Sequence, residues 1–232
     1  LSLLDSCVWL DGDVPAAMAV VARRGDEARL AAFAMRPAYR GKGVGRRLMG
    51  SLLDALREQG VRRMWLEVIR DNHAAGALYH SLGFEVRHGL CGYLSAQTAS
   101  EESSVLQEYD VLALTRRAGA ELNGQLPWLM DPLTFSTLPC RALSLHQQAF
   151  AVLATLSSRP QLQFLWVEPA ARGRGLGREM LMALARQFPG LGTSVTIPER
   201  FTPLFQTAGY TPGVLKQYEM SATLSALPSA GR

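Results

Sequence analysis

Two short segments rich in glycine and basic residues have the spacing that could do chemistry in this chain. Residues 40–46 read Arg-Gly-Lys-Gly-Val-Gly-Arg, and residues 172–178 read Arg-Gly-Arg-Gly-Leu-Gly-Arg. Glycines at alternate positions allow positive φ angles and let a ligand approach backbone amides that no Cβ shields. Where such a turn opens a helix, the unpaired N–H groups and the helix dipole favour an anion, most often a phosphate. Both segments therefore predict anion-binding loops.

The residues of each loop define the candidate binding set. In the first loop they are Arg40, Gly41, Lys42, Gly43, Val44, Gly45 and Arg46, and in the second, more weakly, Arg172, Gly173, Arg174, Gly175, Leu176 and Gly177. A single loop of this kind is equally compatible with a solvated basic turn. A P-loop would need Gly-Lys-Ser/Thr after four intervening residues, and a dinucleotide fingerprint would need glycine where Arg46 and Arg178 stand. The repetition of the loop favours a binding role.

Each loop lies between an expected strand and an expected helix. Apolar runs at 6–10, 16–22 and 28–35 read as antiparallel strands, and residues 46–59 have apolar side chains at helical spacing. A strand at 64–69, a helix at 74–82 and strands at 84–86 and 91–95 follow. The second half repeats this order, with strands at 141–145, 149–156, 162–167 and 218–223 and helices at 179–187 and 202–207. The sequence predicts an α/β (α+β) fold, a mixed, largely antiparallel sheet flanked by helices, occurring twice in tandem.

Residues 98–104 are small and polar and lack hydrophobic periodicity, which is typical of a linker. We expect a first lobe at 1–97 and a second lobe at 105–232, which pack against each other within the chain. A homodimer is a further arrangement compatible with the sequence. A chain of 232 residues with 48% hydrophobic content can bury cores of this size.

Composition limits the class of partner. The formal charge of +4 comes mainly from arginine, since Lys42 and Lys216 are the only lysines, and the basic pairs are scattered rather than gathered into an arm. No apolar run reaches the roughly 18 residues that a membrane span needs. The three cysteines and four histidines lack metal-site spacing, and the odd number of cysteines fits reduced thiols. We therefore expect a cytoplasmic protein with no metal, no nucleic acid and no membrane partner.

The residues that follow the first loop resemble the GNAT superfamily of acetyl-CoA-dependent N-acetyltransferases. The pattern Arg-x-x-Gly-x-Gly is followed by Leu66-Glu67-Val68, Asn72, Ala75, Leu78-Tyr79 and Gly83-Phe84, in the order and at the spacing of the family. Leu-Glu-Val followed by Asn and Leu-Tyr is similar to the ribosomal-protein N-terminal acetyltransferases, and many small-molecule enzymes share it. The resemblance spans residues 6–95 and, more weakly, 105–223.

The resemblance implies an N-acetyltransferase that moves an acetyl group from acetyl-CoA to a primary amine, by direct transfer in a ternary complex. The pyrophosphate of acetyl-CoA would lie on the amides of the first loop, and the pantetheine arm would follow the strand that ends at Met35. Asn72 would be a further residue that binds the cofactor. Tyr79 would stabilise the leaving thiolate, and Glu67 would act as the base, directly or through water. The acceptor would be a small-molecule or peptide amine.

Reference pKa values refine both roles. A phenol at about 10 facing a thiol at about 8.5 makes full proton transfer uphill by about 2 kcal/mol, so we expect a hydrogen bond from Tyr79. Deprotonating an α-amine of pKa about 8 at pH 7 costs roughly 1 to 1.5 kcal/mol, whereas a lysine at about 10.4 costs roughly 4.6 kcal/mol. No second carboxylate is evident beside Glu67. We therefore expect a preference for α-amines or other amines of low pKa.

Other interpretations of these residues stay open. Tyr79 could be a plain core residue and Asn72 could be a helix cap, whereas Glu67 is harder to dismiss because an unpaired buried carboxylate is costly. In the second half Phe205 stands where Tyr79 does, so that copy is expected to bind weakly or to be structural. The strand and two helices with which the family's module usually starts are not found before the first strand. The alternative function is a CoA-binding regulatory or structural pseudoenzyme without turnover.

Overall fold

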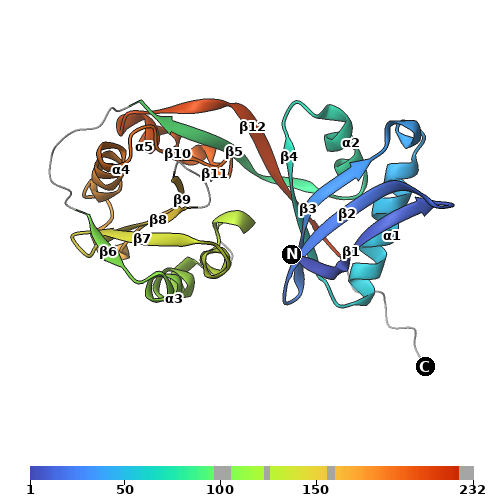
Figure 1. The fold of residues 1–232 in the computed structure, drawn as a ribbon, viewed down its shortest axis with the longest axis horizontal. Helices are drawn as coiled ribbons and strands as arrows, with labels where there is room; N and C mark the ends of the chain where they lie inside the picture. Colours follow the sequence, from blue (N-terminus) through green and yellow to red (C-terminus); the bar gives the residue numbers. More distant parts are fainter. Residues whose placement is uncertain (97–105, 123–125, 156–159, 225–232) are drawn as a thin grey trace. The chain divides into compact units, whose positions relative to one another are not determined.

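The computed structural model describes residues 1–96, 106–122, 126–155 and 160–224. The chain forms two compact units (Figure 1): unit 1 comprises Leu1–His88 with Tyr218–Arg232, and unit 2 comprises Gly89–Gln217. These limits differ from the lobe limits expected at 97 and 105, because β5 (Glu85–Ser95) and β12 (Tyr210–Thr223) each contribute residues to both units. The predicted linker at 98–104 lies outside the described residues.

Unit 1 contains a sheet that starts with an antiparallel meander. β1 (Ser2–Asp11), β2 (Val14–Arg24) and β3 (Glu27–Met35) pair in that order. The turns between them place Gly12 and Gly25 at φ angles of 60° and 59°, which glycine adopts without a steric cost. β4 (Arg63–Ile69) pairs in parallel with β3, and within this unit β12 lies between β4 and β5.

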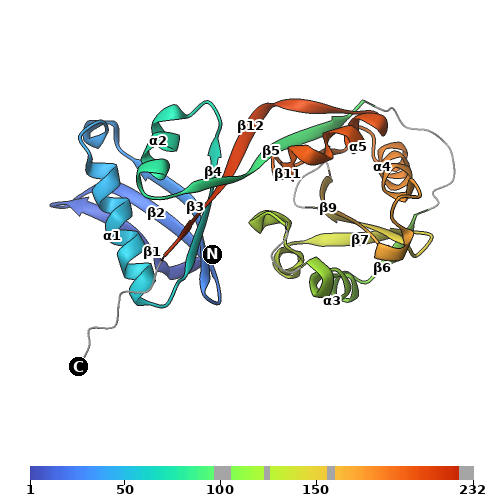
Figure 2. The same cartoon turned by 180° about the vertical axis from the view of Figure 1, so that it is seen from behind.

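Two helices cover the hydrophobic core of unit 1. α1 (Val44–Glu58) buries four side chains at helical spacing, and α2 (His73–Ser81) buries Tyr79. These side chains pack with buried residues of β2, β3 and β4 in one cluster. Figure 2 shows α1 lying across β2 and β3. The core therefore fixes α1 relative to β3, and with it the loop that joins them.

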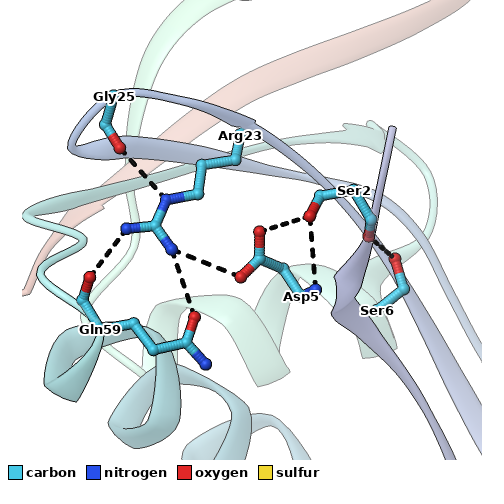
Figure 3. Close-up of polar contacts among 6 residues, drawn as sticks. All are labelled: Ser2, Asp5, Ser6, Arg23, Gly25 and Gln59. Carbon is cyan, nitrogen blue, oxygen red and sulfur yellow. Dashed lines mark hydrogen bonds and ion pairs between the residues drawn. The ribbon is translucent and has the colours of Figure 1, made fainter.

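A polar network anchors β1 and the end of α1 (Figure 3). Arg23 donates from Nη2 to the Gln59 carbonyl at 2.7 Å and from Nη1 to Asp5 Oδ1 at 3.4 Å, while Asp5 is 9% exposed. Ser2 Oγ donates to Asp5 Oδ2 at 2.6 Å, where the register of β1 shifts between Ser2 and Cys7. Gln59 is the C-cap of α1, so Arg23 supplies a cation and a donor at the negative end of that helix.

The pairing of β3 with β4 stops halfway along the strands. The paired residues run from Glu27 with Arg63 to Leu30 with Leu66, although β3 continues to Met35 and β4 to Ile69. The two strands therefore separate before they end. The first Gly-rich loop follows the free end of β3, and Glu67 is the first residue of β4 beyond the paired region.

Unit 2 repeats this plan. β6 (Gln107–Tyr109), β7 (Cys140–Leu145), β8 (Ala149–Ala154) and β9 (Gln161–Val167) form an antiparallel meander, and β10 (Gly192–Thr193) pairs in parallel with β9. Within this unit β5 lies between β10 and β12, and β11 (Ile197–Pro198) also pairs with β5. β9 and β10 pair only at Gln161 with Gly192 and at Leu162 with Thr193. The rest of β9, up to Val167, is therefore not paired with its parallel neighbour β10, as the end of β3 is not paired with β4.

Three α-helices cover two clusters of buried side chains in the described part of unit 2. α3 (Val111–Leu122) packs on one face of the meander, while α4 (Leu176–Gln187) and α5 (Thr202–Thr207) pack on the other cluster. Short 3₁₀ helices lie at Pro37–Tyr39, Trp128–Met130, Pro132–Thr137, Pro169–Ala171 and Glu199–Phe201. The one at Pro37–Tyr39 and the one at Pro169–Ala171 precede the two Gly-rich loops.

The predicted fold class is confirmed, and one pair of strands is corrected. Residues 84–86 and 91–95 were expected as two strands, but the structure has the single strand β5 over Glu85–Ser95. Arg87 Nε donates to Ser221 Oγ at 2.8 Å, and His88 Nδ1 lies 2.7 Å from Glu219 Oε2. These contacts to β12 hold the polar middle of β5 extended, and such distant partners are not visible in a local pattern.

Candidate active site

The first Gly-rich loop joins β3 to α1 with open backbone amides. Gly41 and Gly43 have φ angles of 73° and 72°, and a Cβ at Gly43 would project into open space. Gly43 is the N-cap of α1 and no side chain caps this end, so the first N–H groups of the helix lack an intrahelical partner. An anionic group of a ligand fits this end because amides, helix dipole and the exposed Lys42 all favour negative charge.

Gly45 allows a close approach of α1 to the end of β3. A Cβ at this position would lie 2.9 Å from Met35 Cε and 3.6 Å from Leu78 Cδ2. Arg40 Nε donates to the Met35 carbonyl at 2.9 Å, which ties the loop to the last residue of β3. Arg40 therefore has a structural partner, while Lys42 and Arg46 provide the remaining basic side chains of the loop.

The second loop has the same backbone geometry. Gly173 and Gly175 have φ angles of 75° and 84°, and Gly175 is the N-cap of α4. Arg172 Nε donates to the Val167 carbonyl at 3.0 Å, as Arg40 does to Met35. A cavity of about 530 Å³ opens beside this loop, between the end of β9, the start of α4 and the residues around α5. The second loop, which was expected to bind a ligand weakly or to be structural, thus lines a sizeable cavity.

Glu67 is held in an ion pair that the sequence did not indicate. Arg29 Nε contacts both carboxylate oxygens, at 2.9 and 2.8 Å, and Arg29 Nη2 lies 2.5 Å from Oε2. The side chain of Arg29 is 13% exposed and that of Glu67 is 7% exposed. Burial raises the pKa of the Glu67 carboxyl, and the Arg29 guanidinium opposes that rise. The signal in the sequence was Arg29 itself, a charged residue between the apolar Ala28 and Leu30.

A second carboxylate lies near Glu67, so the expectation that none is present is wrong. Glu219 on β12 is 0% exposed, and its charge adds to the rise in the pKa of Glu67. His88 Nδ1 lies 2.7 Å from Glu219 Oε2. Glu219 comes from the far end of the sequence, and only the insertion of β12 beside β4 brings it here.

Tyr79 lies on α2 at the edge of the core of unit 1. Its side chain is 7% exposed and its ring is 5.8 Å from the ring of Phe84. Burial raises the pKa of the Tyr79 phenol, which makes full proton donation to a thiolate more difficult than reference values suggest. Tyr79 thus keeps its proton at neutral pH and has the chemistry of a hydrogen-bond donor.

Asn72 has the capping role that the sequence left open. Its side-chain Oδ1 accepts a hydrogen bond from the Ala75 amide at 3.2 Å, at the start of α2. This cap sets the direction in which α2 leaves β4, and α2 carries Tyr79. In the structure Asn72 therefore helps to place Tyr79.

Three further properties concern the described part of the chain. No group of three or more histidine, cysteine, aspartate or glutamate side chains there is arranged to hold a metal ion. None of the helices in the described ranges combines the length and the apolar character needed to cross a membrane. Cys7, Cys91 and Cys140 are free thiols, and burial raises the pKa of the Cys7 and Cys140 thiols.

Comparison with proteins of known sequence supports the resemblance in the first part of the chain. Residues 3–84 match the model of the acetyltransferase (GNAT) family. The [Ribosomal protein bS18]-alanine N-acetyltransferase of Escherichia coli K12 is 51% identical over 59 residues, which are 25% of this chain and 40% of that protein. The enzyme of the same name from Haemophilus influenzae is 37% identical over 81 residues, which are 35% of this chain and 55% of that protein. The chain thus spans about half or less of the length of these relatives.

Comparison with solved structures extends the likeness in fold to both units. The match to a tandem GNAT protein from the clavulanic acid biosynthesis pathway covers 95% of this chain and 83% of that protein's chain, with a TM-score of 0.63 and 14% identity. The match to a GCN5-related N-acetyltransferase from Sphaerobacter thermophilus covers 92% of this chain and 78% of that protein's chain, with a TM-score of 0.65 and 16% identity. At this identity the likeness concerns the fold alone. Residues 3–84 are therefore similar to the acetyltransferase (GNAT) family, in a chain whose fold is similar to that of a tandem GNAT protein.

Proposed function

We propose that the chain is an N-acetyltransferase whose reaction takes place in unit 1, with acetyl-CoA as donor and a primary amine as acceptor. The observation that carries this proposal is the position of Glu67, at the point where β3 and β4 separate, in the unit that also holds the first loop and Tyr79. The loop fits the donor because its glycines leave amides and a helix N-terminus open to a pyrophosphate. The free thiols fit a reducing compartment, and we place the enzyme in the cytoplasm.

The reaction would be a direct transfer in a ternary complex. The acceptor ammonium loses one proton to Glu67, directly or through water, and its nitrogen then attacks the thioester carbonyl. The C–S bond breaks as the amide forms, the second proton of the nitrogen passes to solvent water, and the thiolate of CoA departs with a hydrogen bond from Tyr79. The raised pKa of Glu67 makes it a stronger base than an ordinary glutamate, which suits proton abstraction near neutral pH.

The acceptor class that we propose is an α-amine, and this preference rests on the pKa of the amine alone, since Glu219 is a second carboxylate near Glu67. An α-amine of pKa about 8 costs roughly 1 to 1.5 kcal/mol to deprotonate at pH 7, against roughly 4.6 kcal/mol for a lysine side chain. The similarity of 59 residues of the chain to an enzyme named [Ribosomal protein bS18]-alanine N-acetyltransferase supports an amine of a peptide or protein as acceptor. We therefore propose the N-terminal amine of a peptide or protein as the acceptor.

The competing function is a CoA-binding pseudoenzyme, and one observation favours it. Arg29 contacts both oxygens of Glu67, so the base is already paired before any amine arrives. In the enzyme the amine would have to compete with, or act beside, this guanidinium. In the pseudoenzyme the pair would simply close the site.

Turnover on a panel of amines separates the two functions. The panel contains an alanine-initiated peptide, the same peptide with a blocked N-terminus and an internal lysine, and small primary amines, each with acetyl-CoA and a thiol-detecting assay. The enzyme predicts faster turnover on the free N-terminus and a large fall in kcat for Glu67→Gln and Tyr79→Phe. Acetyl-CoA binding without turnover on any amine would support the pseudoenzyme, and equal rates on both peptides would contradict the α-amine preference.

A further inference from the structure

Four side chains that carry charge or protons form a row across neighbouring strands of unit 1. The strand order there is β3, β4, β12 and β5 (Figure 1), and these strands carry Arg29, Glu67, Glu219 and His88 in that order. Arg29 Nε lies 2.8 Å from Glu67 Oε2, and His88 Nδ1 lies 2.7 Å from Glu219 Oε2. The two carboxylates are therefore the inner members of the row, and a nitrogen base from an outer strand holds each of them.

The two carboxylates lie on the same face of the sheet. Side chains of β4 and β12 that belong to the hydrophobic cluster with α1 and α2 are Leu66, Val68, Met220 and Ala222. Successive side chains of a strand point to opposite faces, so Glu67 and Glu219 both point away from this cluster. Just beyond the two strands the Leu224 amide donates to the Arg62 carbonyl at 2.7 Å. This bond and the shared face bring Glu219 alongside Glu67.

Arg29 and Glu219 act on Glu67 in opposite directions. A guanidinium that contacts both oxygens favours the ionised carboxylate, and such a carboxylate is a weak base. A second carboxylate in a buried site disfavours ionisation of the first. Burial raises the pKa of Glu67, the contacts with Arg29 lower it, and the charge of Glu219 raises it. Glu219 thus offsets part of the effect of Arg29.

β5 holds Glu219 in this position. The Glu219 side chain is 0% exposed, whereas that of His88 is 23% exposed. An ionised carboxylate only accepts hydrogen bonds, so His88 Nδ1 carries the proton in their contact. Next to it Arg87 Nε donates to Ser221 Oγ on β12 at 2.8 Å. The charged groups on this face are Arg29 on β3 and Arg87 and His88 on β5, with Glu27 and Arg63 as a more exposed pair further along β3 and β4.

We propose that Glu219 is a positioning residue for the reaction of unit 1: its buried carboxylate, held by His88, keeps Glu67 able to take the proton of the acceptor amine although Arg29 binds both oxygens of Glu67. The role of Glu219 rests on the proposed function of Glu67 as the base. Glu219 acts through Glu67 and exchanges no proton with the amine. The ion pair of Arg29 with Glu67 is then compatible with catalysis, because two carboxylates share the charge of one guanidinium.

A carboxyl ¹³C NMR titration of the whole chain tests this proposal without any turnover. The Glu67 signal, assigned by its loss in Glu67→Gln, should titrate about one pH unit lower in Glu219→Gln than in the wild type. Glu27→Gln is the matched control, because Glu27 stands two residues before Arg29 on β3 and its side chain is 37% exposed. That variant should move the Glu67 titration by less than about 0.3 unit, since solvent screens an exposed charge. An unmoved Glu67 titration in Glu219→Gln, or an equal shift in both variants, would overturn the proposal.

Variants of the partly exposed His88 test the same coupling should Glu219→Gln fail to fold. His88→Arg places a permanent cation beside Glu219, and His88→Gln places a neutral donor there. Glu67 should therefore titrate at a lower pH in His88→Arg than in His88→Gln, by about half a unit or more. Equal titrations of Glu67 in these two variants would overturn the proposal.

Initial rates on the alanine-initiated peptide connect the coupling to the reaction. The acid limb of the kcat/KM profile should move to lower pH in Glu219→Gln by the same interval as the Glu67 titration, and Glu219→Asp, which keeps the charge, should restore it. A purely structural role of Glu219 would lower the rate without moving this limb, and that result would overturn the proposal. A Glu67 shift in a chain that turns over no amine would instead refute the proposed function and leave the coupling of Glu219 to Glu67 in place.

Discussion

Replacing Arg29 by methionine tests whether the Arg29–Glu67 pair balances a buried charge in unit 1. The substitution removes the guanidinium and keeps an unbranched apolar side chain. Glu67 is only 7% exposed, so its carboxylate would lose both contacts of the guanidinium without gaining full hydration. Removing one partner of a buried pair costs about 3–5 kcal/mol. Most domains have only about 5–15 kcal/mol of stability in total, so the effect should be plain in a denaturation curve.

The loss should depend on pH in a defined direction. Burial already holds the pKa of Glu67 above its usual range, and Arg29 opposes this rise, so Arg29→Met should raise the pKa further. A carboxyl group whose pKa is higher in the folded state binds more protons there than in the unfolded chain. Its contribution to stability therefore falls as the pH rises from the unfolded value of about 4.3 to the folded value. The variant should be closest to the wild type at the acid end of this interval and furthest from it at pH 8.

Urea unfolding at pH 5 and pH 8 measures both effects. Arg29→Met combined with Glu67→Met should recover most of the loss, because replacing both members of a buried pair by apolar residues is often neutral or stabilising. Arg63→Met is the matched control: Arg63 pairs with Glu27 on the same two strands at 3.3 Å, with side chains 49% and 37% exposed. That variant should change stability by at most about 1 kcal/mol. A loss in Arg29→Met below about 1 kcal/mol, or an equal loss at both pH values, would refute the reasoning.

Two further pairs of variants compare the units. Gly45→Ala would place a Cβ 2.9 Å from Met35 Cε, the end of a flexible side chain that can move aside, so the KM for acetyl-CoA should change at most about twofold. Gly177→Ala meets its nearest neighbour at 3.7 Å and should be neutral or stabilising by about 0.5–1 kcal/mol. Tyr79→Phe should lower kcat with little change in melting temperature. Tyr210→Phe should cost about 1–2 kcal/mol of stability and leave kcat unchanged, because the buried Tyr210 hydroxyl donates to the Leu181 carbonyl at 3.0 Å. Initial-rate kinetics and thermal unfolding read out all four variants, and a kcat loss in Tyr210→Phe equal to that in Tyr79→Phe would contradict the assignment.

The fold was predictable from local patterns wherever neighbours in the sequence are neighbours in space. The meander of β1, β2 and β3 follows from apolar runs joined by tight turns, and α1 follows from apolar residues at helical spacing ended near Gly60. β5 was not predictable as one strand, because its middle is held by Ser221 and Glu219 on β12. The limits of the compact units depend on the same two strands and are equally non-local.

The candidate site also has a part that local patterns indicate and a part that depends on distant residues. Glu67, Tyr79 and the loop could be located from motif spacing, since they lie within one short stretch of chain. The partners that set the chemistry of Glu67 could not, because Arg29 lies on another strand and Glu219 comes from the last strand of the chain. Motif spacing thus nominates the groups as candidates, whereas their protonation depends on contacts between distant residues.

The repeated loop separates a structural role of its motif from a binding role. The first arginine of each copy donates to the carbonyl at the end of the preceding strand, at 2.9 Å for Arg40 and 3.0 Å for Arg172, so its recurrence is explained without any ligand. What distinguishes the copies lies outside the motif, in the side chains at the strand ends and in the residue at the position of Tyr79. Because the space beside each loop is set by those side chains, two loops of the same geometry can serve different ligands.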